Sequence, residues 1–274
     1  MEIRLSRFER QRLTMQNGYF KPKLAKFIFQ SQKIVVFTGA GISTESGISD
    51  YRSKGGIWDR FQPVTIQEFL ASEEKRIEYW KTKSELYESF LTAKPNKGHF
   101  SIAKIQQVGK LRGLITQNID GLHQMAGVDQ DKTCELHGTN RETICLSCSA
   151  LTSWQETFQR LKAGEKAPRC LACNGLLKPN TISFGQTLDP VVLQRSVEWS
   201  RDCDFLLALG STLIVEPAAS LPRLAKRAGA KLVIITLSPT PLDDLADVSL
   251  KAPIGETMGN ALEEFERLYE KSSH

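Results

Sequence analysis

Two Cys-x-x-Cys pairs constrain the fold of this chain more than any other feature of its sequence. Cys145 pairs with Cys148 and Cys170 with Cys173, and 21 residues separate the pairs. Each such turn presents two thiolates on one side, and a tetrahedral Zn²⁺ takes four ligands. The spacing therefore predicts one structural zinc. Because four thiolates leave no open coordination position, we expect the metal to hold a ribbon rather than to perform chemistry.

Disulfides and a thioredoxin-like redox pair are the alternatives for these cysteines. The N-terminus has arginines but no continuous apolar run, and it contains Glu2 and Glu9, so it fits neither a secretory signal nor a transit peptide. We therefore expect a cytoplasmic protein with reduced thiols. Two matched pairs, neither of which opens a helix after a strand, disfavour the redox interpretation. Cys134 and Cys203 lie in or beside apolar segments, and we expect both to be buried packing residues.

Composition excludes several classes of protein. Of 274 residues, 41% are hydrophobic and 24% are charged, and no apolar stretch is long enough to span a bilayer. The sequence therefore predicts no membrane partner. The net charge of +5 comes from scattered basic residues rather than from one run, so nucleic-acid binding is not expected.

Apolar runs alternate with segments of helical periodicity along the chain. Four runs are rich in β-branched residues and are typical of buried parallel strands: 33–39, 111–118, 204–211 and 231–238. The segments with helical periodicity between them include 97–109, 189–200 and 217–228. This alternation predicts an α/β fold with a Rossmann-like, doubly wound parallel sheet. The flanking regions 1–30 and 257–269 are expected to be peripheral helices.

Two segments interrupt the alternation and predict a small module of two parts. Residues 52–92 begin with a turn-rich stretch and continue as a polar helical insertion, while residues 137–179 hold the zinc ribbon. The Rossmann-like domain then comprises the remaining segments: 1–51, 93–136 and 180–274.

Small and polar residues follow all four predicted strands, where a doubly wound sheet binds its ligand. After the first strand, Gly39 and Gly41 allow the backbone to approach a phosphate closely. The pattern is not a standard dinucleotide fingerprint, because Thr44 stands where the third glycine would fall. A tight connection from strand to helix explains the two glycines equally well.

Among the histidines, His137 has the most unusual setting, in an ELHG segment at the edge of the predicted zinc module. His99 begins an amphipathic helix and is expected to be buried or to cap that helix. His123 lies on a short helix and is expected to be structural. A lone histidine does not establish a catalytic role.

Six motifs occur in an order that resembles the sirtuins, the NAD-dependent protein deacylases, and a prokaryotic member in particular. The resemblance covers roughly residues 25–268. The motifs are GAGISTESGISDYRS (39–53), TQNIDGLH (116–123), ELHG (135–138), the two cysteine pairs, ISFGQ (182–186) and LGSTLIVEPAASLP (209–222).

The resemblance implies a role for each matching position. It implies that His137 is the general base and that Asn118 and Asp120 support the chemistry at the nicotinamide ribose. The residues implied to contact NAD are Gly39, Ala40, Gly41, Thr44, Asp50, Tyr51, Arg52, Gln117, Asn118, Ile119, Asp120, Gly210, Ser211, Thr236, Leu237 and Ile254. The residues implied to hold the peptide between two strands are Ile182, Phe184, Gly185, Ile214, Val215 and Glu216.

The implied reaction transfers the acyl group of an acyl-lysine protein to ADP-ribose and releases nicotinamide, so NAD is a co-substrate. A neutral imidazole suits the base, because its reference pKa of about 6.5 lies near working pH. Mono-ADP-ribosyl transfer and NAD hydrolysis on the same scaffold are alternatives. A non-enzymatic NAD-binding regulator is disfavoured because His137, Asn118 and Asp120 are all present.

Several positions depart from the family pattern without removing a proposed catalytic group: Ser49 replaces proline, Tyr51 phenylalanine, Thr236 asparagine and Gln186 glutamate. Sirtuins that remove acidic acyl groups carry a Tyr-x-x-Arg pair. This chain lacks the pair, because the residue three positions after Tyr79 is Thr82 and the residue three positions after Tyr87 is Phe90. Lys81 and Lys83 lie on the same predicted helix, but we expect both to point to solvent. A neutral acyl group, acetyl or longer, is therefore expected.

Overall fold

A computed structural model describes residue 20 and residues 22–53 and 55–272, and it contains two separate β-sheets. The larger sheet has the strand order β3-β2-β1-β7-β8-β9, and every pair in it is parallel. The four predicted strands are confirmed as its central members: β1 (Ile34–Thr38), β2 (Leu111–Thr116), β7 (Phe205–Leu209) and β8 (Lys231–Ile235). The edge strands β3 (Thr133–Glu135) and β9 (Val248–Leu250) were not predicted.

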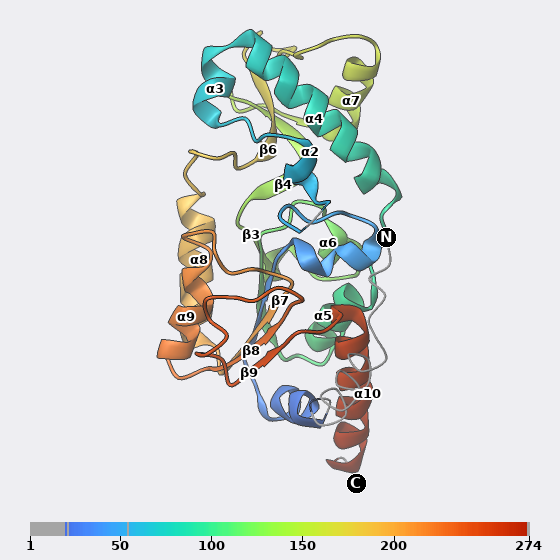
Figure 1. Ribbon diagram of the computed structural model, residues 1–274, viewed down its shortest axis with the longest axis vertical. Coiled ribbons are helices and arrows are strands. Elements are labelled where there is room, and N and C mark those ends of the chain that lie inside the picture. The colour runs from blue at the N-terminus through green and yellow to red at the C-terminus, as the bar shows by residue number, and fades with distance from the viewer. Residues whose placement is uncertain (1–19, 21, 54, 273–274) are drawn as a thin grey trace.

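Helices cover both faces of this sheet (Figure 1). On one face, Val36 and Leu207 join a core with α5 (Lys97–Gln107) and α10 (Ile254–Ser272). On the other, Val35 and Leu206 pack against α8 (Pro190–Asp202) and α9 (Ser220–Arg227). Successive side chains of a strand point to opposite faces, so a strand that is buried on both faces must be apolar throughout. The doubly wound prediction is confirmed.

The smaller sheet is antiparallel and has the order β5-β4-β6. It comprises β4 (Gly138–Cys145), β5 (Leu151–Ser153) and β6 (Leu177–Thr181), with α7 (Trp154–Lys162) packed beside it. The insertion before α5 is helical as predicted: α2 (Ile57–Arg60), α3 (Ile66–Ala71) and α4 (Glu73–Thr92). Trp80 of α4 stacks on Trp154 of α7 with ring centres 5.4 Å apart, which joins the insertion to the cysteine-bearing segment.

Short helical turns follow β1 and β2 at the ends that face the small module: η1 (Ala40–Ile42) and η2 (Thr44–Ser46) come after β1, and α6 (Leu122–Met125) comes after β2. A further turn, η3 (Gln130–Lys132), leads into the amino end of β3. Of the predicted N-terminal helix, residues 22–30 are helical, and residues 1–19 and 21 lie outside the described residues. None of the helices that the structure describes is both long and apolar enough to cross a bilayer.

Candidate active site

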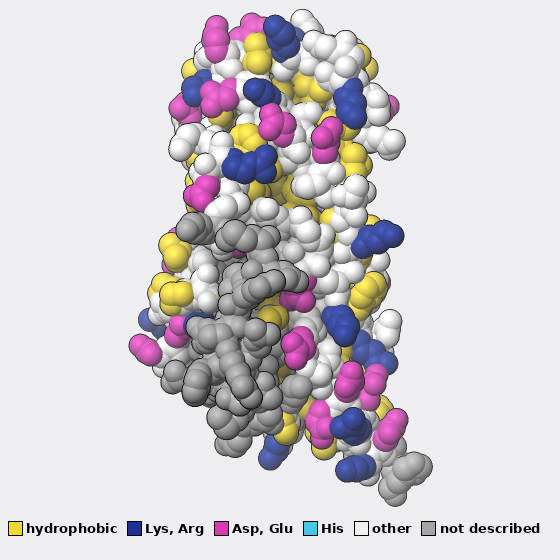
Figure 2. Space-filling model, turned by 45° about the vertical axis from the view of Figure 1, so that its right-hand side comes forward, with side chains coloured by type: hydrophobic (Ala, Val, Ile, Leu, Met, Phe, Trp, Pro, Cys, Tyr) yellow, Lys and Arg dark blue, Asp and Glu magenta, His cyan; other side chains and the backbone are white. Residues whose placement is uncertain are grey.

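A cavity of about 1400 Å³ is lined by residues at the carboxyl ends of the parallel strands and by residues of the small module. Its walls bring together most of the predicted site residues: Gly39, Ala40, Gly41, Thr44, Asp50, Tyr51, Arg52, Gln117, Asn118, Ile119, His137, Ile182, Phe184, Gly185, Gly210, Ser211, Val215, Glu216, Thr236, Leu237 and Ile254. Asp120 and Ile214 are not among the lining residues. Hydrophobic side chains gather at the waist of the molecule, below the small module (Figure 2).

The Gly-Ala-Gly turn packs against the turn that follows β7. A Cβ atom at Gly39 would lie 2.8 Å from the carbonyl oxygen of Gly210, and one at Gly41 would be equally close to it. The N–H of Gly41 donates to the same carbonyl oxygen at 2.8 Å. Close packing of two strand ends therefore requires both glycines, and the N–H group of Gly41 already has a partner within the protein.

His137 lies between β3 and β4, where its half-buried side chain lines the cavity. Its Nδ1 atom is 3.0 Å from the carbonyl oxygen of Gln117. A carbonyl only accepts, so Nδ1 carries the proton and Nε2 keeps its lone pair. Burial lowers the pKa of His137; the hydrogen bond to Gln117 opposes this effect, and the charge of Arg52 adds to it. The imidazole is therefore a neutral base at neutral pH.

Asp120 lies behind the cavity wall and is joined to Asn118 through Ser43. The Ser43 hydroxyl donates to Asp120 Oδ2 at 2.7 Å and accepts from Asn118 Nδ2 at 3.2 Å. The N–H of Leu122 donates to Asp120 Oδ1 at 3.0 Å. Burial raises the pKa of Asp120, although these hydrogen bonds favour its ionised form. Ser43 thus fixes both predicted residues, although nothing in the sequence around it predicts this role.

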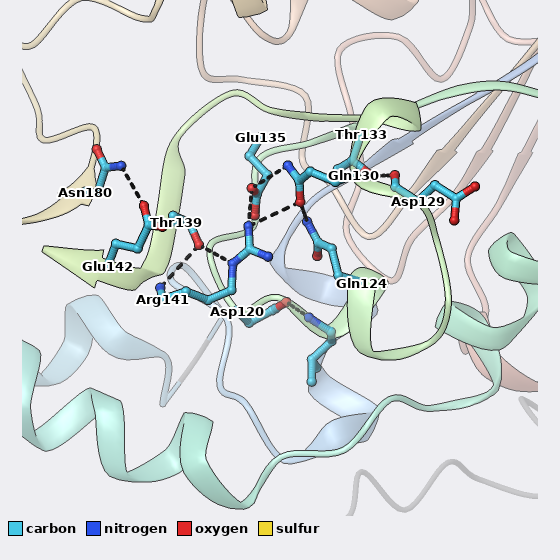
Figure 3. A network of polar contacts seen from close by, with 11 residues as sticks. Asp120, Gln124, Asp129, Gln130, Thr133, Glu135, Thr139, Arg141, Glu142 and Asn180 are labelled. Carbon is cyan, nitrogen blue, oxygen red and sulfur yellow. Dashed lines mark hydrogen bonds and ion pairs between the residues drawn. The ribbon is translucent and has the colours of Figure 1, made fainter. Parts of the chain in front are cut away.

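A second polar network lies behind the segment that carries Asp120 (Figure 3). The guanidinium of Arg141 donates to Glu135 Oε2 at 2.6 Å and, from Nε, to the Thr139 hydroxyl at 2.9 Å. Gly121 has a φ of +73°, and a Cβ there would lie 3.4 Å from Arg141 Cδ. Because Glu135 belongs to β3 and Arg141 to β4, the ion pair joins the two sheets on either side of His137.

The loop after η2 packs on the predicted peptide-binding segment through aromatic rings. Asp50 Oδ1 accepts from the N–H groups of Arg52 and Ser53, at 3.0 and 2.8 Å. The guanidinium carbon of Arg52 lies 4.1 Å from the ring centre of Trp58. Trp58 in turn packs against Phe184, with ring centres 5.6 Å apart. The loop and the 182–185 segment therefore form one continuous wall.

Backbone hydrogen bonds tie this predicted peptide segment to His137, the predicted base. The N–H of Ile182 donates to the carbonyl oxygen of His137 at 2.8 Å, and the carbonyl oxygen of Phe184 accepts from Ile66 at 3.0 Å. Phe184 and Ile214 are nevertheless 45% and 58% exposed, respectively. Large apolar side chains that stay exposed beside a cavity are typical of a surface that another molecule covers.

The four predicted zinc ligands converge at one end of the small module. Their sulfur atoms all lie within 4.8 Å of one another, with Cys145 and Cys173 Sγ 3.5 Å apart. Ser149 and Asn174, each directly after a Cys-x-x-Cys pair, adopt left-handed φ values of 59° and 58°. Each of these residues reverses the chain and so closes a tight turn, or knuckle, around its two cysteines. Backbone N–H groups of the first knuckle lower the pKa of the Cys145 thiol to about 6. This closed set of four thiolates fits one structural Zn²⁺.

The two other described histidines, His99 and His123, and the two other cysteines lie where the sequence predicted, and His274 lies outside the described residues. His99 is buried and caps α5 through Nδ1, and His123 is buried with Nε2 3.0 Å from the Thr38 hydroxyl. Cys134 and Cys203 are also buried. None of these four residues lines the cavity.

The model of the Sir2 family matches residues 39–217, which is more than half of the chain. The chain belongs to the Sir2 family. It is 44% identical over 237 residues to "NAD-dependent protein deacetylase 1" of Bradyrhizobium diazoefficiens, a match that covers 86% of this chain and 93% of that protein. It is 42% identical over 241 residues to the "NAD-dependent protein deacetylase" of Thermodesulfovibrio yellowstonii, covering 88% and 93%.

Solved Sir2 structures share the fold over nearly their whole length. One, described under the mechanism and regulation of Sir2 enzymes, has a TM-score of 0.82 at 37% identity and covers 90% of this chain and 98% of that chain. Another, a Sir2 protein with a deacetylated p53 peptide and 3′-O-acetyl-ADP-ribose, has a TM-score of 0.83 at 35% identity, covering 88% and 97%.

One sequence-based expectation about this Sir2 member is wrong. Lys81 is exposed and lies outside the cavity as expected, but Lys83 is half-buried and lines the cavity together with Tyr79 and Thr82. The buried stacking of Trp80 on Trp154 sets the rotation of α4, and this rotation turns Tyr79 and Lys83 toward the cavity. Helical spacing places Tyr79, Thr82 and Lys83 on one face, because residues three and four apart share a face, but it does not determine which way that face points.

Proposed function

We propose that this chain removes acyl groups from protein lysines with ADP-ribose as the acceptor, and that His137 is its general base. The family match and the relatives described above make the chain an NAD-dependent protein deacylase. The observation that carries the assignment of the base is the contact between His137 Nδ1 and the Gln117 carbonyl oxygen. That contact leaves Nε2 as the one nitrogen of the ring that can accept a proton.

NAD fits the part of the cavity at the carboxyl ends of β1, β7 and β8. This part combines small residues at 39–41 with the hydroxyls of Ser211 and Thr236, and the whole cavity, at about 1400 Å³, exceeds the range of about 300 to 1,000 Å³ that is typical of small-molecule sites. When bound, NAD supplies the ribose carbon that loses nicotinamide. The Gln117 side-chain amide donates to Ser211 Oγ at 2.8 Å. This hydrogen bond joins the segment after β2 to the segment after β7 at this site.

We assign a separate role in the reaction to each group of residues. His137 Nε2 takes the proton of a ribose hydroxyl, which makes that oxygen the nucleophile toward the acyl carbon. Asn118 lines the cavity on the nicotinamide side, and Asp120, behind the cavity wall, is joined to it through Ser43. Tyr51, Arg52 and Trp58 form the wall of the cavity on the side of the loop after η2, where they exclude water from the reacting groups.

We propose that the acyl-lysine peptide lies between residues 182–185 and 214–216 as an added strand. Solved relatives of this chain are described as bound to an acetylated peptide and to a propionylated peptide, which supports this class of ligand. The exposed side chains of Phe184 and Ile214 border the opening that such a peptide would cover.

The test is incubation of the protein with NAD and a panel of acyl-lysine peptides, followed by mass spectrometry for O-acyl-ADP-ribose. Nicotinamide release that depends on the peptide and equals product formation supports deacylation. Nicotinamide release that is equally fast without peptide would instead indicate NAD hydrolysis, and label transferred from NAD to protein would indicate ADP-ribosyl transfer.

We further propose the domain boundaries that the sequence predicts, with segments 1–51, 93–136 and 180–274 in one domain and 52–92 and 137–179 in the other. The existence of two separate sheets supports this division. We also propose a cytoplasmic location, because a reduced four-thiolate site suits a reducing compartment. Cell fractionation with a tagged full-length chain tests the location.

A further inference from the structure

The peptide group between Gln117 and Asn118 is held from both sides. Its carbonyl oxygen accepts from His137 Nδ1 at 3.0 Å, and its N–H group donates to the Thr116 hydroxyl at 3.0 Å. This peptide bond is trans, so the two groups point in opposite directions in one plane. A rotation of the plane that breaks one hydrogen bond therefore weakens the other. The Thr116 hydroxyl thus helps to set the direction of the carbonyl group that orients His137.

Hydrogen bonds continue behind Thr116 to a second threonine and a histidine. The Thr38 hydroxyl donates to Thr116 Oγ1 at 2.8 Å, and Thr38 Oγ1 lies 3.0 Å from His123 Nε2. Because Thr38 gives its only hydroxyl proton to Thr116, the contact with His123 requires a proton on Nε2. Thr116 Oγ1 accepts two hydrogen bonds, one for each lone pair. These three residues, here called the threonine–histidine network, end on the peptide group that contacts His137.

The threonine–histidine network is shielded from water. Thr38, Thr116 and His123 are each no more than 2% exposed, and none of them lines the cavity. Hydrogen bonds in such surroundings are stronger than at a surface, and members of a network strengthen one another. The two threonines face each other at the ends of β1 and β2. A pair of valines would fill the same space at little cost, so packing alone does not require the two hydroxyls.

The side chain of Asn118 has a support of its own. Its Nδ2 atom donates to the Ser43 hydroxyl at 3.2 Å, on a separate path from the backbone N–H group. Thr38 restrains the backbone a second time, because its carbonyl oxygen accepts from the N–H of Gln117 at 3.0 Å. Loss of the threonine hydroxyls should therefore disturb the Gln117 carbonyl more than the Asn118 amide.

His123 stays neutral at the far end of the network. Its Nδ1 atom is buried without a hydrogen-bond partner among the described residues, so a second proton on the ring would have no acceptor. Burial lowers the pKa of His123, and the neighbouring His99 lowers it further. The proton on Nε2 therefore stays in place at neutral pH, and Thr38 keeps its own proton directed at Thr116.

We propose that Thr116, Thr38 and His123 are positioning residues for deacylation, which hold the peptide group after Gln117 and, through it, the imidazole of His137. The inference rests on the assignment of His137 as the general base. A misplacement of about 1 Å can cost on the order of 10²-fold in rate, so restricting one peptide plane affects turnover. A Thr116 hydroxyl that only closed the local turn at 116–118 would be indifferent to Thr38 and His123.

The test removes one hydroxyl at a time and measures kcat and KM with an acetyl-lysine peptide. Thr116→Val keeps the shape of the side chain and should lower kcat by about tenfold or more. Ser43 still holds Asn118, so the KM values for NAD and peptide should change by less than about twofold. Thr116→Ser keeps the hydroxyl and should retain kcat. Thr38→Val should lower kcat by about threefold or more, and Thr38→Ser should not.

Thr143→Val is the matched control. Thr143 is also fully buried, and its hydroxyl pairs with that of another buried threonine, Thr157, at 2.9 Å. This pair joins β4 to α7, and neither residue lines the cavity. Thr143→Val should therefore leave kcat unchanged, even if it alters the melting temperature.

Ring NMR of His137 supplies a readout that does not depend on turnover. The ¹⁵N signals of the ring, assigned by their loss in His137→Ala, should show a proton on Nδ1 in the unmodified protein. Thr116→Val should shift the ring toward a mixture of the two tautomers, because the Gln117 carbonyl is no longer held in place. Thr116→Ser should keep the single tautomer.

Unchanged kcat in both valine variants, or an unchanged tautomer of His137 in Thr116→Val, would overturn the proposal. A higher KM for NAD with kcat intact would also overturn it, because the network would then act on the cofactor through Asn118. If a thermal melt shows that Thr116→Val is not folded, the kcat values and ring spectra of Thr38→Val and Thr38→Ser decide by the same criteria. Activity retained in His137→Ala would remove the proposed base and this inference together. Activity lost in His137→Ala but kept in both valine variants would remove this inference alone.

Discussion

The Nδ1 atom of His137 lies 3.0 Å from the carbonyl oxygen of Gln117, and the side chain of Gln117 in turn donates to Ser211 at 2.8 Å. One residue thus orients the imidazole through its backbone and holds the β7 turn through its side chain. Orientation by a backbone carbonyl needs no second titratable group, so the protonation of the ring alone determines whether it acts as a base.

Replacing His137 by alanine should reduce deacylation by about 10² to 10⁴-fold, because positioned proton transfer contributes that much. The side chain belongs to neither hydrophobic core nor to the cysteine cluster, so melting temperature and zinc content should stay unchanged. Product formation and bound zinc should be measured on the same sample. Activity within about tenfold of the unmodified protein would rule out His137 as the base.

The acid limb of the pH profile should reflect the lowered pKa of His137. The neutral imidazole is the active form, so kcat/KM should hold as pH falls through about 6.5, the reference value. It should then decline only below that point, as the ring becomes protonated. The profile is measured with a saturating concentration of NAD and a neutral acetyl-lysine peptide. An acid limb with its midpoint above the reference value would contradict the effect of burial.

Ser43→Ala should impair the site without unfolding it. The hydroxyl donates to the Asp120 carboxylate and accepts from Asn118, so its loss removes one charged and one neutral hydrogen bond. A hydrogen bond to a charged group contributes about 1.5 to 3 kcal/mol, which corresponds to a loss of about tenfold or more in kcat/KM. Ser89→Ala, which alters an exposed hydroxyl of α4, is the control. Equal activity of the two variants would show that Ser43 does not position Asp120.

The sequence predicted the centre of the fold better than its edges, and the reason is physical. The central strands are buried on both faces and must be continuously apolar, as in the IVVFT of β1. The edge strands β3 and β9 have three residues each and include Thr133, Glu135 and Ser249, so no apolar run marks them. The sequence motifs predicted most of the residues that line the cavity, because these motifs lie at the carboxyl ends of the strands.

Two features of the site depended on packing that no motif records. Ser43 is an ordinary serine until β1 and β2 bring it beside Asp120, 77 positions away along the chain. The orientation of Lys83 follows from the burial of Trp80 against Trp154, a contact between segments that are distant in sequence. Sequence spacing gives the helix face that Lys83 shares, but only this packing decides which way the face points.

His99 and His123 should make the protein less stable as pH falls. Their rings are 4.9 Å apart, and His99 Nε2 and His123 Nδ1 are buried without a hydrogen-bond partner among the described residues. Burial lowers the pKa of His99 to about 4, and that of His123 lies well below its usual value. Both are therefore neutral when folded, whereas in the unfolded chain both bind protons below about pH 6.5.

The stability contributed by the neutral rings is thus fully present above about pH 6.5 and is lost as pH falls toward 4. Each histidine should contribute a slope of about 1.4 kcal/mol per pH unit to the free energy of unfolding in this window. Urea unfolding at several pH values measures the slope, and His99→Gln should remove about half of it. A free energy of unfolding that is constant between these pH values would show that the pair is not buried as neutral rings.

Removal of zinc should disrupt the small module and, through Trp80, the part of the cavity wall that α4 forms. Cys145 and Cys170 belong to the same buried cluster as Trp80 and Trp154, so the metal and the tryptophan stack stabilise one core. A closed four-thiolate site contributes directly to folding. A strong chelator, or Cys170→Ser, should therefore cause aggregation and change tryptophan fluorescence together with the loss of activity. Cys203→Ala, which removes a buried thiol outside the cluster, should keep one zinc per chain. Soluble, active protein that contains no zinc would contradict this role for the four cysteines.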